Sequence, residues 1–303
     1  MTTLEKINFH GWSNCYRLSN KEIELVVTTD VGPRVSAWGF KGGTNEFAEY
    51  LAEHGKTGGD NWHIFGGHRL WHAPESIPRT YYPDNFPIKL EEHTGFIRVI
   101  QPTEPTTGIQ KEIDFAMADD KNMVKVTHRL KNNGLWAVDL AIWALSVMTT
   151  GGVGILPLPP RGTHTENLLP TNSLTIWAYT DMSDPRWTWG KKYILLRQDP
   201  KAETPQKVGY MNLNGWAAYA NHNNLFVKTF IPVPGATYPD FGCSVETFTN
   251  ADMLELETVG PMVKLEPGAT VEHLENWYLF RDVPAPKNDG DVDKYILPKV
   301  LSL

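Results

Sequence analysis

Three glutamates near the C-terminal end of the chain have the type and spacing needed for acid–base chemistry or sugar binding. Glu246 lies in one strand-like run, and Glu255 and Glu257 lie in the next. Because side chains alternate along a strand, Glu255 and Glu257 must share one face of it. Carboxylates on one face of a sheet can accept hydrogen bonds from sugar hydroxyls or remove a proton.

The turn between the two runs decides where Glu246 points. A two-residue turn at 250–251 pairs Glu246 with Glu255 on the shared face, whereas a three-residue turn at 250–252 sends Glu246 to the opposite face. Like charges directly opposite each other destabilise a strand pair by roughly 0.2–1 kcal/mol, so we expect a cation, a ligand or a raised carboxyl pKa to offset them. The alternative is a solvated outer face of a hairpin.

A second set of polar side chains lies in the segment 61–85, which places three histidines, two arginines and several aromatic residues among glycines and prolines. Long polar and aromatic loops over a β scaffold commonly form binding sites. Such a loop either holds a sugar or a carboxylate, or uses the same groups for structural hydrogen bonds. The ligand-binding residues expected from this segment are Arg69, Trp71, His72, Glu75, Tyr82 and Asp84.

A metal site at His63, His68 and His72 is disfavoured. The i, i+4 spacing of His68 and His72 converges on a metal only in a helix, and Pro74 and the preceding Gly-Gly pair oppose a long helix. The chain also lacks the HExxH, P-loop, GxGxxG and GxSxG patterns. We therefore expect no metal and no cofactor.

A third polar and aromatic segment, 177–192, contains Arg186 and Trp187. It forms either one wall of a binding site or a surface loop with packed tryptophans. The chain has eleven tryptophans in all, many of them near Gly, Pro, Asn or His. Indole rings beside polar groups suit a ligand with flat apolar faces and polar edges, which is the character of a sugar.

Composition excludes several partners. The net charge is -7 and no long basic run is present, so we expect no nucleic acid to bind. No apolar run approaches the ~20 residues that span a bilayer, and the N-terminus lacks an apolar signal region, so we expect a cytoplasmic protein away from membranes. Cys15 and Cys243 allow at most one disulfide. The oligomeric state is not indicated.

Period-2 patterns dominate the chain and predict an all-β sandwich or barrel. We expect one domain over residues 1–303, with loops at 151–161 and 233–239 and a short C-terminal helix at about 292–301 interrupted by Pro298. The predicted strands cover residues 22–29, 33–40, 108–118, 123–130, 137–147, 207–213, 224–232, 243–250, 253–258 and 270–280.

Several motifs resemble the galactose mutarotase (aldose 1-epimerase) superfamily. Residues 256–273, with LET, LEPG and a histidine, are similar to its closing motif. Residues 22–38 resemble its opening strand and Gly-x-Arg turn, in which we expect Arg34 to be structural, and residues 133–148 resemble its central strand. The GGHRLWHAPE and WTWGKK segments look like a bacterial branch of this superfamily to which we attach no activity.

The resemblance implies a large antiparallel β-supersandwich with a carbohydrate site on its concave face. It implies that Glu257 is the base that takes the proton of the anomeric hydroxyl, while an acid protonates the ring oxygen. The superfamily's acid is a histidine, but Trp143 stands in the matching place here, and an indole does not supply a proton at neutral pH. We therefore predict His68 as the acid, across the pocket from Glu257, with Trp143, Glu246 and Glu255 binding the sugar.

Three functions fit these residues. The first is a carbohydrate-binding protein of aldose 1-epimerase type that interconverts anomers through Glu257. The second is a sugar-binding or sensing protein on the same fold without turnover, which the missing motif histidine favours. The third is a lyase or glycosidase for acidic oligosaccharides, in which Arg69, Arg186 and His68 hold a uronate and Tyr81 or Tyr82 serves as acid or base.

Overall fold

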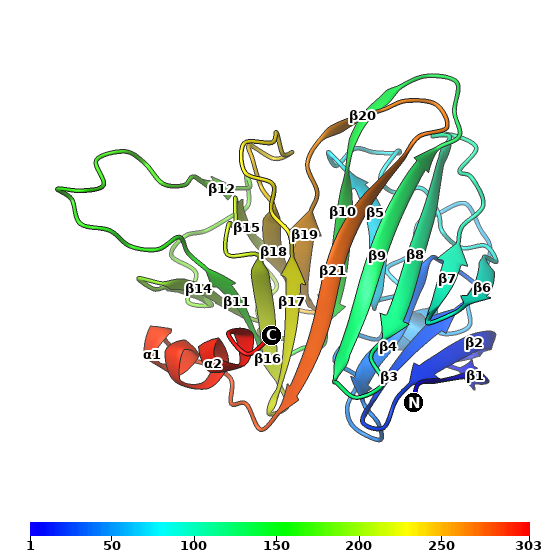
Figure 1. The fold of residues 1–303 in the computed structure, drawn as a ribbon, viewed down its shortest axis with the longest axis horizontal. Coiled ribbons are helices and arrows are strands. Elements are labelled where there is room, and N and C mark those ends of the chain that lie inside the picture. Colours follow the sequence, from blue (N-terminus) through cyan, green and yellow to red (C-terminus); the bar gives the residue numbers. More distant parts are fainter.

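A computed structural model describes all 303 residues. Its strands form two large sheets that pack face to face, with the N-terminal strands at one end and the C-terminal helices at the other (Figure 1). Every pairing within the two sheets is antiparallel. The expected all-β, antiparallel supersandwich is therefore confirmed.

The first sheet has eleven strands and carries the glutamate hairpin. In spatial order its strands are β1 (Thr3–Phe9), β2 (Trp12–Ser19), β3 (Ile23–Thr28), β4 (Arg34–Phe40), β5 (His68–Ala73), β10 (Val138–Met148), β19 (Leu254–Val259), β18 (Val245–Thr249), β15 (Gln206–Tyr210) and β12 (Leu174–Ile176), with β20 (Val263–Leu265) beside the start of β10.

The second sheet has ten strands and covers one face of the first. In spatial order these are β13 (Trp187–Trp189), β14 (Tyr193–Arg197), β11 (Val153–Pro157), β16 (Trp216–Asn221), β17 (Asn224–Phe230), β21 (Thr270–Arg281), β9 (Met123–Asn132), β8 (Ile109–Met117), β7 (Phe96–Ile100) and β6 (Lys89–His93).

Helices are short and peripheral. A 3₁₀ turn, η1, covers Leu51–Glu53, and the chain closes with α1 (Asp289–Asp291), a π-helical segment η2 (Val292–Ile296) and α2 (Leu297–Val300). The predicted C-terminal helix is present, and Pro298 lies in the first turn of α2, where its missing N–H costs nothing. None of the helices has the length and apolar character required to cross a membrane.

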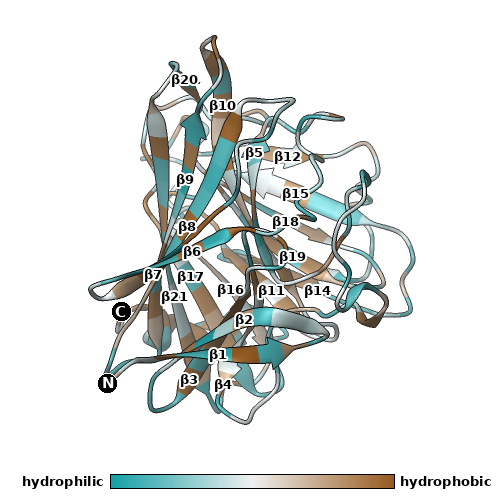
Figure 2. Cartoon of the chain, turned by 90° about the vertical axis from the view of Figure 1, so that its right-hand side faces the viewer, coloured by the Kyte–Doolittle hydropathy of each residue, from teal (hydrophilic) through white to brown (hydrophobic).

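Alternation along the strands separates two apolar layers, and short hydrophobic and hydrophilic stretches follow each other along them (Figure 2). On one side of β10, Leu140, Ile142 and Met148 join a cluster of 38 buried residues between the sheets. On the other side, Trp143 and Leu145 join a separate small cluster. Burial of each large apolar side chain stabilises the fold by about 1.5–3 kcal/mol, so the large cluster holds the sheets together.

Three segments that were expected to be loops contain strands. The segment 61–85 includes β5 in the centre of the first sheet, residues 151–161 include β11, and residues 177–192 include β13. The glycines, prolines and charged residues of these segments have a low strand preference. They form strands nevertheless, because pairing with neighbouring strands in the folded protein outweighs local preference. Cys15 and Cys243 are both buried and free, so no disulfide links them.

The glutamate hairpin has neither of the two expected turn lengths. Thr249 pairs with Leu254, which leaves four residues, 250–253, in the connection. The side-chain carbonyl of Asn250 accepts hydrogen bonds from the backbone N–H groups of the two residues that precede Leu254. The register places Glu246 directly opposite Glu257, so all three glutamates share a face.

Candidate functional site

The side of the first sheet that faces away from the second sheet carries rows of charged and aromatic side chains. One row crosses four strands as Arg69, Leu145, Glu257 and Glu246. Trp71 and Trp143 form the next row on one side. The two rows share one face of the sheet because Arg69 and Trp71, and likewise Leu145 and Trp143, lie two positions apart on the same strand.

Lys207, Phe248 and Glu255 form the row on the other side of the Arg69–Glu246 row. A cavity of about 710 Å³ lies over this face, and eight of its nineteen lining residues are aromatic. The lining residues are Tyr50, Trp62, Ile64, Arg69, Trp71, Glu75, Tyr81, Trp143, Leu145, Trp177, Tyr179, Glu203, Pro205, Lys207, Phe248, Asn250, Asp252, Met253 and Glu255.

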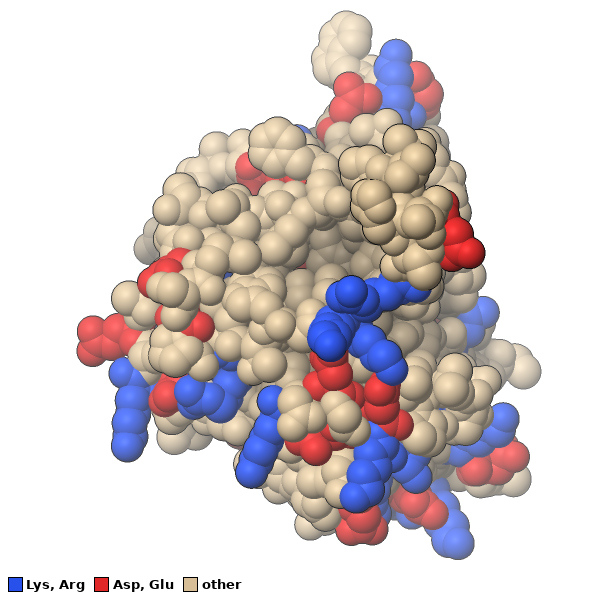
Figure 3. Space-filling model, turned by 90° about the vertical axis from the view of Figure 1, so that its left-hand side faces the viewer, with Lys and Arg blue, Asp and Glu red and all other residues tan.

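A hollow of about 500 Å³ lies elsewhere, beside the long loop between β11 and β12 that projects from the molecule in Figure 1. Its charged residues are Arg161 and Lys191, and no carboxylate lines it. On the face at this end of the molecule, positive and negative side chains lie intermixed without a broad patch of one sign (Figure 3). Acid–base groups are therefore organised over the first sheet and not in this hollow.

Lys207 is the central cation of the larger cavity. Its ammonium lies 2.7 Å from Glu246 Oε2 and 3.0 Å from Glu257 Oε2. It also lies 4.7 Å from the ring centres of both Trp143 and Trp177. One lysine thus contacts two fully buried carboxyl groups and also makes cation–π contacts with Trp143 and Trp177.

The carboxyl groups beneath Lys207 are shifted in their acidity. Burial raises the pKa of Glu246 well above its ordinary value, and the neighbouring Glu257 adds to the effect although Lys207 opposes it. Burial also raises the pKa of Glu257. For Lys207, burial alone would lower the pKa, but Glu246 and Glu257 outweigh it and raise the pKa well above the ordinary value. A single ammonium is therefore shared between two buried carboxyl groups whose pKa values are both raised.

Glu257 makes two contacts through one oxygen. Trp143 Nε1 donates a hydrogen bond of 2.8 Å to Glu257 Oε2, the same oxygen that Lys207 contacts. Glu257 is fully buried beneath these two side chains, and its Oε1 has no hydrogen-bond partner. Trp143, which stands where the resemblance expects an acid, therefore anchors the predicted base.

Arg69 and Glu255 form the second ion pair of the floor. Arg69 Nη2 donates to Glu255 Oε1 at 2.7 Å, and both side chains are at least nine-tenths buried. The guanidinium carbon lies 4.2 Å from the ring centre of Trp71 and 5.6 Å from that of Trp62. The pair is thus held between aromatic faces at the edge of the cavity.

Two aromatic walls flank these ion pairs. Trp62 packs edge-on against Tyr81 with ring centres 5.5 Å apart, and both are partly exposed to the cavity. On the other side, Tyr179 lies edge-on to Phe248 at 6.4 Å, next to Trp177. Aromatic faces of this kind can stack against the apolar face of a ring-shaped ligand.

Of the predicted site residues, Arg69, Trp71, Glu75, Trp143 and Glu255 line the cavity. Glu246 and Glu257 lie directly beneath it, against Lys207. The remaining predicted residues do not line the cavity, namely His68, His72, Tyr82, Asp84, Arg186 and Trp187.

His68 and Glu257 are not brought together. His68 lies on β5 one residue before Arg69, so its side chain points to the opposite side of the sheet, between the two layers. It is fully buried, with Nδ1 2.9 Å from Ser146 Oγ and Nε2 2.8 Å from His128 Nε2. The predicted acid therefore has no path to a ligand in the cavity, and no histidine lines that cavity.

The partners of His68 define a directed hydrogen-bond chain. His128 Nδ1 donates to the carbonyl oxygen of His273, so the Nε2 of a neutral His128 accepts from His68. His273 Nε2 lies 2.8 Å from the hydroxyl of Thr258. Burial lowers the pKa of His128 to about 4 and that of His273 to about 3, so both are neutral at pH 7.

Glu275 ends this chain. It accepts from the Thr258 hydroxyl and from Trp277 Nε1, and it lies 2.7 Å from the ammonium of Lys228. His68, His128 and Glu275 have donor atoms within 4.8 Å of one another, a spacing that also suits a metal. Because each already has a protein partner and Lys228 supplies the positive charge, hydrogen bonds account for this cluster without a metal.

The other predicted residues outside the cavity lie elsewhere in the fold. His72 is buried on the core-facing side of β5, where its two ring nitrogens have no hydrogen-bond partner and burial lowers its pKa to about 3. Asp84 pairs with Arg34, which is itself buried as expected for a structural arginine. Tyr82 borders a separate hollow of about 180 Å³.

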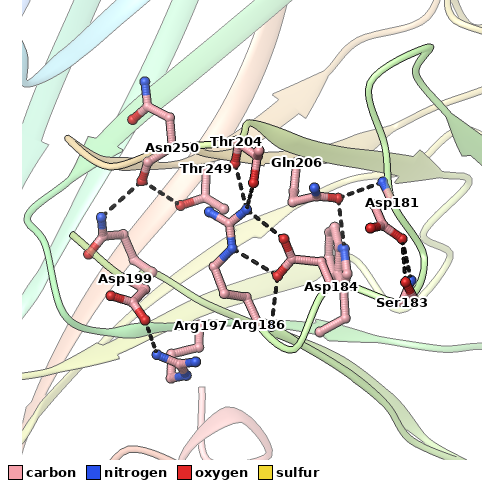
Figure 4. Close-up of polar contacts among 12 residues, drawn as sticks. Asp181, Ser183, Asp184, Arg186, Arg197, Asp199, Thr204, Gln206, Thr249 and Asn250 are labelled. Atoms are coloured by element: carbon pink, nitrogen blue, oxygen red, sulfur yellow. Dashed lines mark hydrogen bonds and ion pairs between the residues drawn. The ribbon is translucent and has the colours of Figure 1, made fainter. Parts of the chain in front are cut away.

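Arg186 pairs with Asp184 in its own loop and with Thr204 in the loop between β14 and β15 (Figure 4). Its guanidinium donates to both carboxylate oxygens of Asp184 and to the backbone carbonyl of Thr204. Trp187 is buried and donates through Nε1 to Gln206. These contacts fix the loop before β15, which contributes Glu203 and Pro205 to the cavity wall.

Lys207 is the main residue that the sequence did not single out. It lies at an inward position of a predicted strand, and a lysine in the apolar run KVGYMNL is the signal that marks it. The cavity-lining aromatic residues Trp62, Trp177, Tyr179 and Phe248 come from three distant segments, so only the folded structure brings them together.

No family model matches the sequence, and no curated protein matches it either. Solved structures do match. A proposed aldose 1-epimerase from Klebsiella pneumoniae has a TM-score of 0.61 at 13% identity, covering 99% of this chain and 87% of that one. A galactose mutarotase-like protein from Lactobacillus casei has a TM-score of 0.57 at 9% identity, covering 88% of this chain and 100% of that one.

A TPR-domain containing protein from Parabacteroides distasonis is also similar, with a TM-score of 0.59 at 15% identity. That match covers 90% of this chain but 48% of the other, so the shared fold is one part of a longer protein. At such low identities the likeness concerns architecture and not activity. The chain therefore has the galactose mutarotase-like fold.

Proposed function

We propose that this protein binds a carbohydrate in the cavity over the first sheet. The observation that carries the proposal is the pairing of two aromatic walls with two ion pairs on the floor between them. A sugar ring has an apolar face that stacks on an aromatic side chain and hydroxyl edges that exchange hydrogen bonds with charged groups. The volume of about 710 Å³ is within the range of small-molecule sites.

Binding without turnover is the function that the geometry supports best. A base must reach the proton that it removes, within about 2.6–3.2 Å or through one water. Glu257 is fully buried and shares its Oε2 between Trp143 and Lys207. Lys207 is held protonated by its two carboxyl neighbours, so it is a poor acid for a ring oxygen.

Anomer interconversion is the second candidate function. It is favoured by one observation, the unpartnered Oε1 of Glu257 together with the raised pKa of that carboxyl group. A raised pKa brings a carboxylate closer to the strength needed of a general base. Turnover would require Trp143 or Lys207 to move aside so that Glu257 meets the sugar.

Action on acidic oligosaccharides is disfavoured by charge. Arg69 and Lys207 are the cations that line the cavity, and both are already paired with glutamates. Four carboxylate side chains line the same cavity, at Glu75, Glu203, Asp252 and Glu255. A uronate would meet more negative than positive charge there.

The proposal is tested by titrating the protein with a panel of mono- and disaccharides while following tryptophan fluorescence. We expect saturable binding, with sugars recovered unchanged by NMR. Trp177→Ala should weaken binding about 3- to 10-fold, because one aromatic contact is worth about 0.5–1.5 kcal/mol. Trp136→Ala is the matched control, since Trp136 is 80% exposed and does not line the cavity.

Absence of binding by every sugar, or equal loss of binding in both variants, would contradict the proposal. Turnover is measured separately by the rate at which α and β anomers interconvert in exchange NMR. We expect no acceleration over buffer. An acceleration that Glu257→Gln abolishes would replace the first candidate function with the second.

A further inference from the structure

The floor of the cavity holds more buried negative than positive groups. Glu246 and Glu257 are fully buried and Glu255 is 7% exposed, whereas the buried cations beside them are Arg69 and Lys207. Arg69 pairs with Glu255, and Lys207 alone faces the other two carboxyl groups. A buried carboxylate without a balancing cation is unfavourable, and burial raises the pKa of both Glu246 and Glu257.

The rim of the cavity adds to this imbalance. Glu75, Glu203 and Asp252 line the cavity and are exposed, and no rim cation accompanies them. Their charges act across a cavity with aromatic, low-dielectric walls, which concentrates the negative potential in it. The same walls offer ring faces that attract a cation.

We propose that the cavity selects a carbohydrate that carries a positively charged amino group, that is, an amino sugar. This inference rests on the proposed carbohydrate-binding function and specifies the class of sugar. The ring stacks on the aromatic walls, while the ammonium lies in the field of the rim carboxylates Glu75, Glu203 and Asp252. A neutral sugar makes the first contact but not the second, and a uronate is repelled by the rim.

The experiment compares sugars that differ in charge on one ring. D-Glucosamine, N-acetyl-D-glucosamine and D-glucuronate share a pyranose ring but carry a positive, a neutral and a negative group. We expect D-glucosamine to bind about 10-fold or more tightly than its N-acetylated counterpart at low salt, with D-glucuronate weakest. We expect that preference to shrink as salt is raised, because screening weakens the attraction.

Substitutions of rim carboxylates test whether these side chains cause the preference for D-glucosamine. Asp252→Asn and Glu203→Gln change exposed side chains of the rim and should each reduce the ratio of D-glucosamine to N-acetyl-D-glucosamine affinity about 2- to 5-fold. Asp120→Asn is the matched control, because Asp120 is exposed and lies outside the cavity. A preference that survives in both rim variants would overturn the assignment of the rim.

Failure of the inference differs from failure of the proposed function. Equal binding of D-glucosamine and its N-acetylated counterpart, or tighter binding of D-glucuronate, would overturn the amino-sugar inference and leave carbohydrate binding intact. No binding by any of the three, or by any other sugar of the panel, would overturn both.

Discussion

The two sides of strands β10 and β19 carry equally buried polar groups with opposite electrostatic character. On the side between the sheets, the chain from Ser146 through the histidines to Glu275 pairs its donors with acceptors, and Lys228 balances Glu275. On the cavity side, Lys207 is shared between Glu246 and Glu257, and carboxyl oxygens lack hydrogen-bond partners. Burial of charge thus does not by itself mark a site, and the two sides differ in how completely their charges are compensated.

Glu275 and Glu246 show how charge compensation differs between the two sides of the sheet. Both are fully buried, and each lies 2.7 Å from the ammonium of a buried lysine. Burial raises the pKa of both, but Lys228 and two histidines bring that of Glu275 down to about 2. Glu246 shares its lysine with Glu257, so its pKa stays well above the ordinary value. Identical substitutions at the two positions should therefore have different costs.

The largest effect is expected from Glu275→Gln. It leaves the ammonium of Lys228 buried without a counter-charge, which should cost about 3–5 kcal/mol of the free energy of unfolding. Urea denaturation at pH 7 measures the loss. The double variant Lys228→Met/Glu275→Leu removes both charges and should be more stable than Glu275→Gln. A loss below about 1 kcal/mol would contradict the assignment of Glu275 as an essential ionised group.

Acidification should lower the free energy of unfolding through the histidines that lie between the two sheets. The pKa of His128 falls from about 6.5 in the unfolded chain to about 4 in the fold, mainly because of burial. The neutral imidazole therefore contributes stability that is complete above pH 6.5 and is lost as the pH falls toward 4, on the order of 3 kcal/mol. Urea midpoints between pH 7.5 and 4.5 measure it, and His128→Gln should flatten the decline. An unchanged slope in that variant would refute the assignment.

Lys207→Met should have a smaller effect than Glu275→Gln at pH 7, about 1–3 kcal/mol, because Glu246 and Glu257 can each take up a proton. Both carboxyl groups would then have folded-state pKa values above their unfolded ones. The stability that the variant loses relative to the unsubstituted protein should therefore be smallest at low pH and grow as the pH rises toward 8. Denaturation of both proteins at pH 5.5 and pH 8 measures this difference, and an equal loss at both pH values would argue against it.

The smallest effect is expected from Glu246→Gln. Burial and the neighbouring Glu257 raise the pKa of the Glu246 carboxyl well above its ordinary value, so a neutral amide of similar shape should disturb this side less than it disturbs Glu275. The free energy of unfolding at pH 7 should change by less than about 1 kcal/mol. Glu275→Gln is the matched comparison under the same conditions. Equal losses in the two variants would remove the difference between the two sides of the sheet.

Period-2 patterns were sufficient to predict an all-β sandwich or barrel, and the resemblance to the galactose mutarotase superfamily implied the supersandwich. The even spacing of Glu255 and Glu257 correctly predicted their shared face. The same alternation applied to β5 would have sent His68 away from Arg69, but Gly, Pro and charged neighbours concealed that strand. The turn length at 250–253 was not predictable either, because its geometry depends on backbone N–H groups that donate to the side-chain oxygen of Asn250.

The central cation of the cavity escaped prediction for a different reason. Lys207 sits in an apolar strand, and its partners Glu246 and Glu257 are distant in sequence and reach it only through strand order β15–β18–β19. Non-local pairing of this kind is fixed by the fold and not by local composition. The aromatic walls depend on the same arrangement.

The most direct test of the carbohydrate site is to label the tryptophan indoles with ¹⁵N and follow their N–H signals while the tightest-binding sugar of the panel is added. Single Trp→Phe variants assign the signals. We predict that Trp62, Trp71, Trp143 and Trp177, which line the cavity, shift together with one saturation curve, while Trp136 on the surface and Trp277 in the core do not. Shifts confined to tryptophans outside the cavity, or no shift with any sugar, would contradict the account.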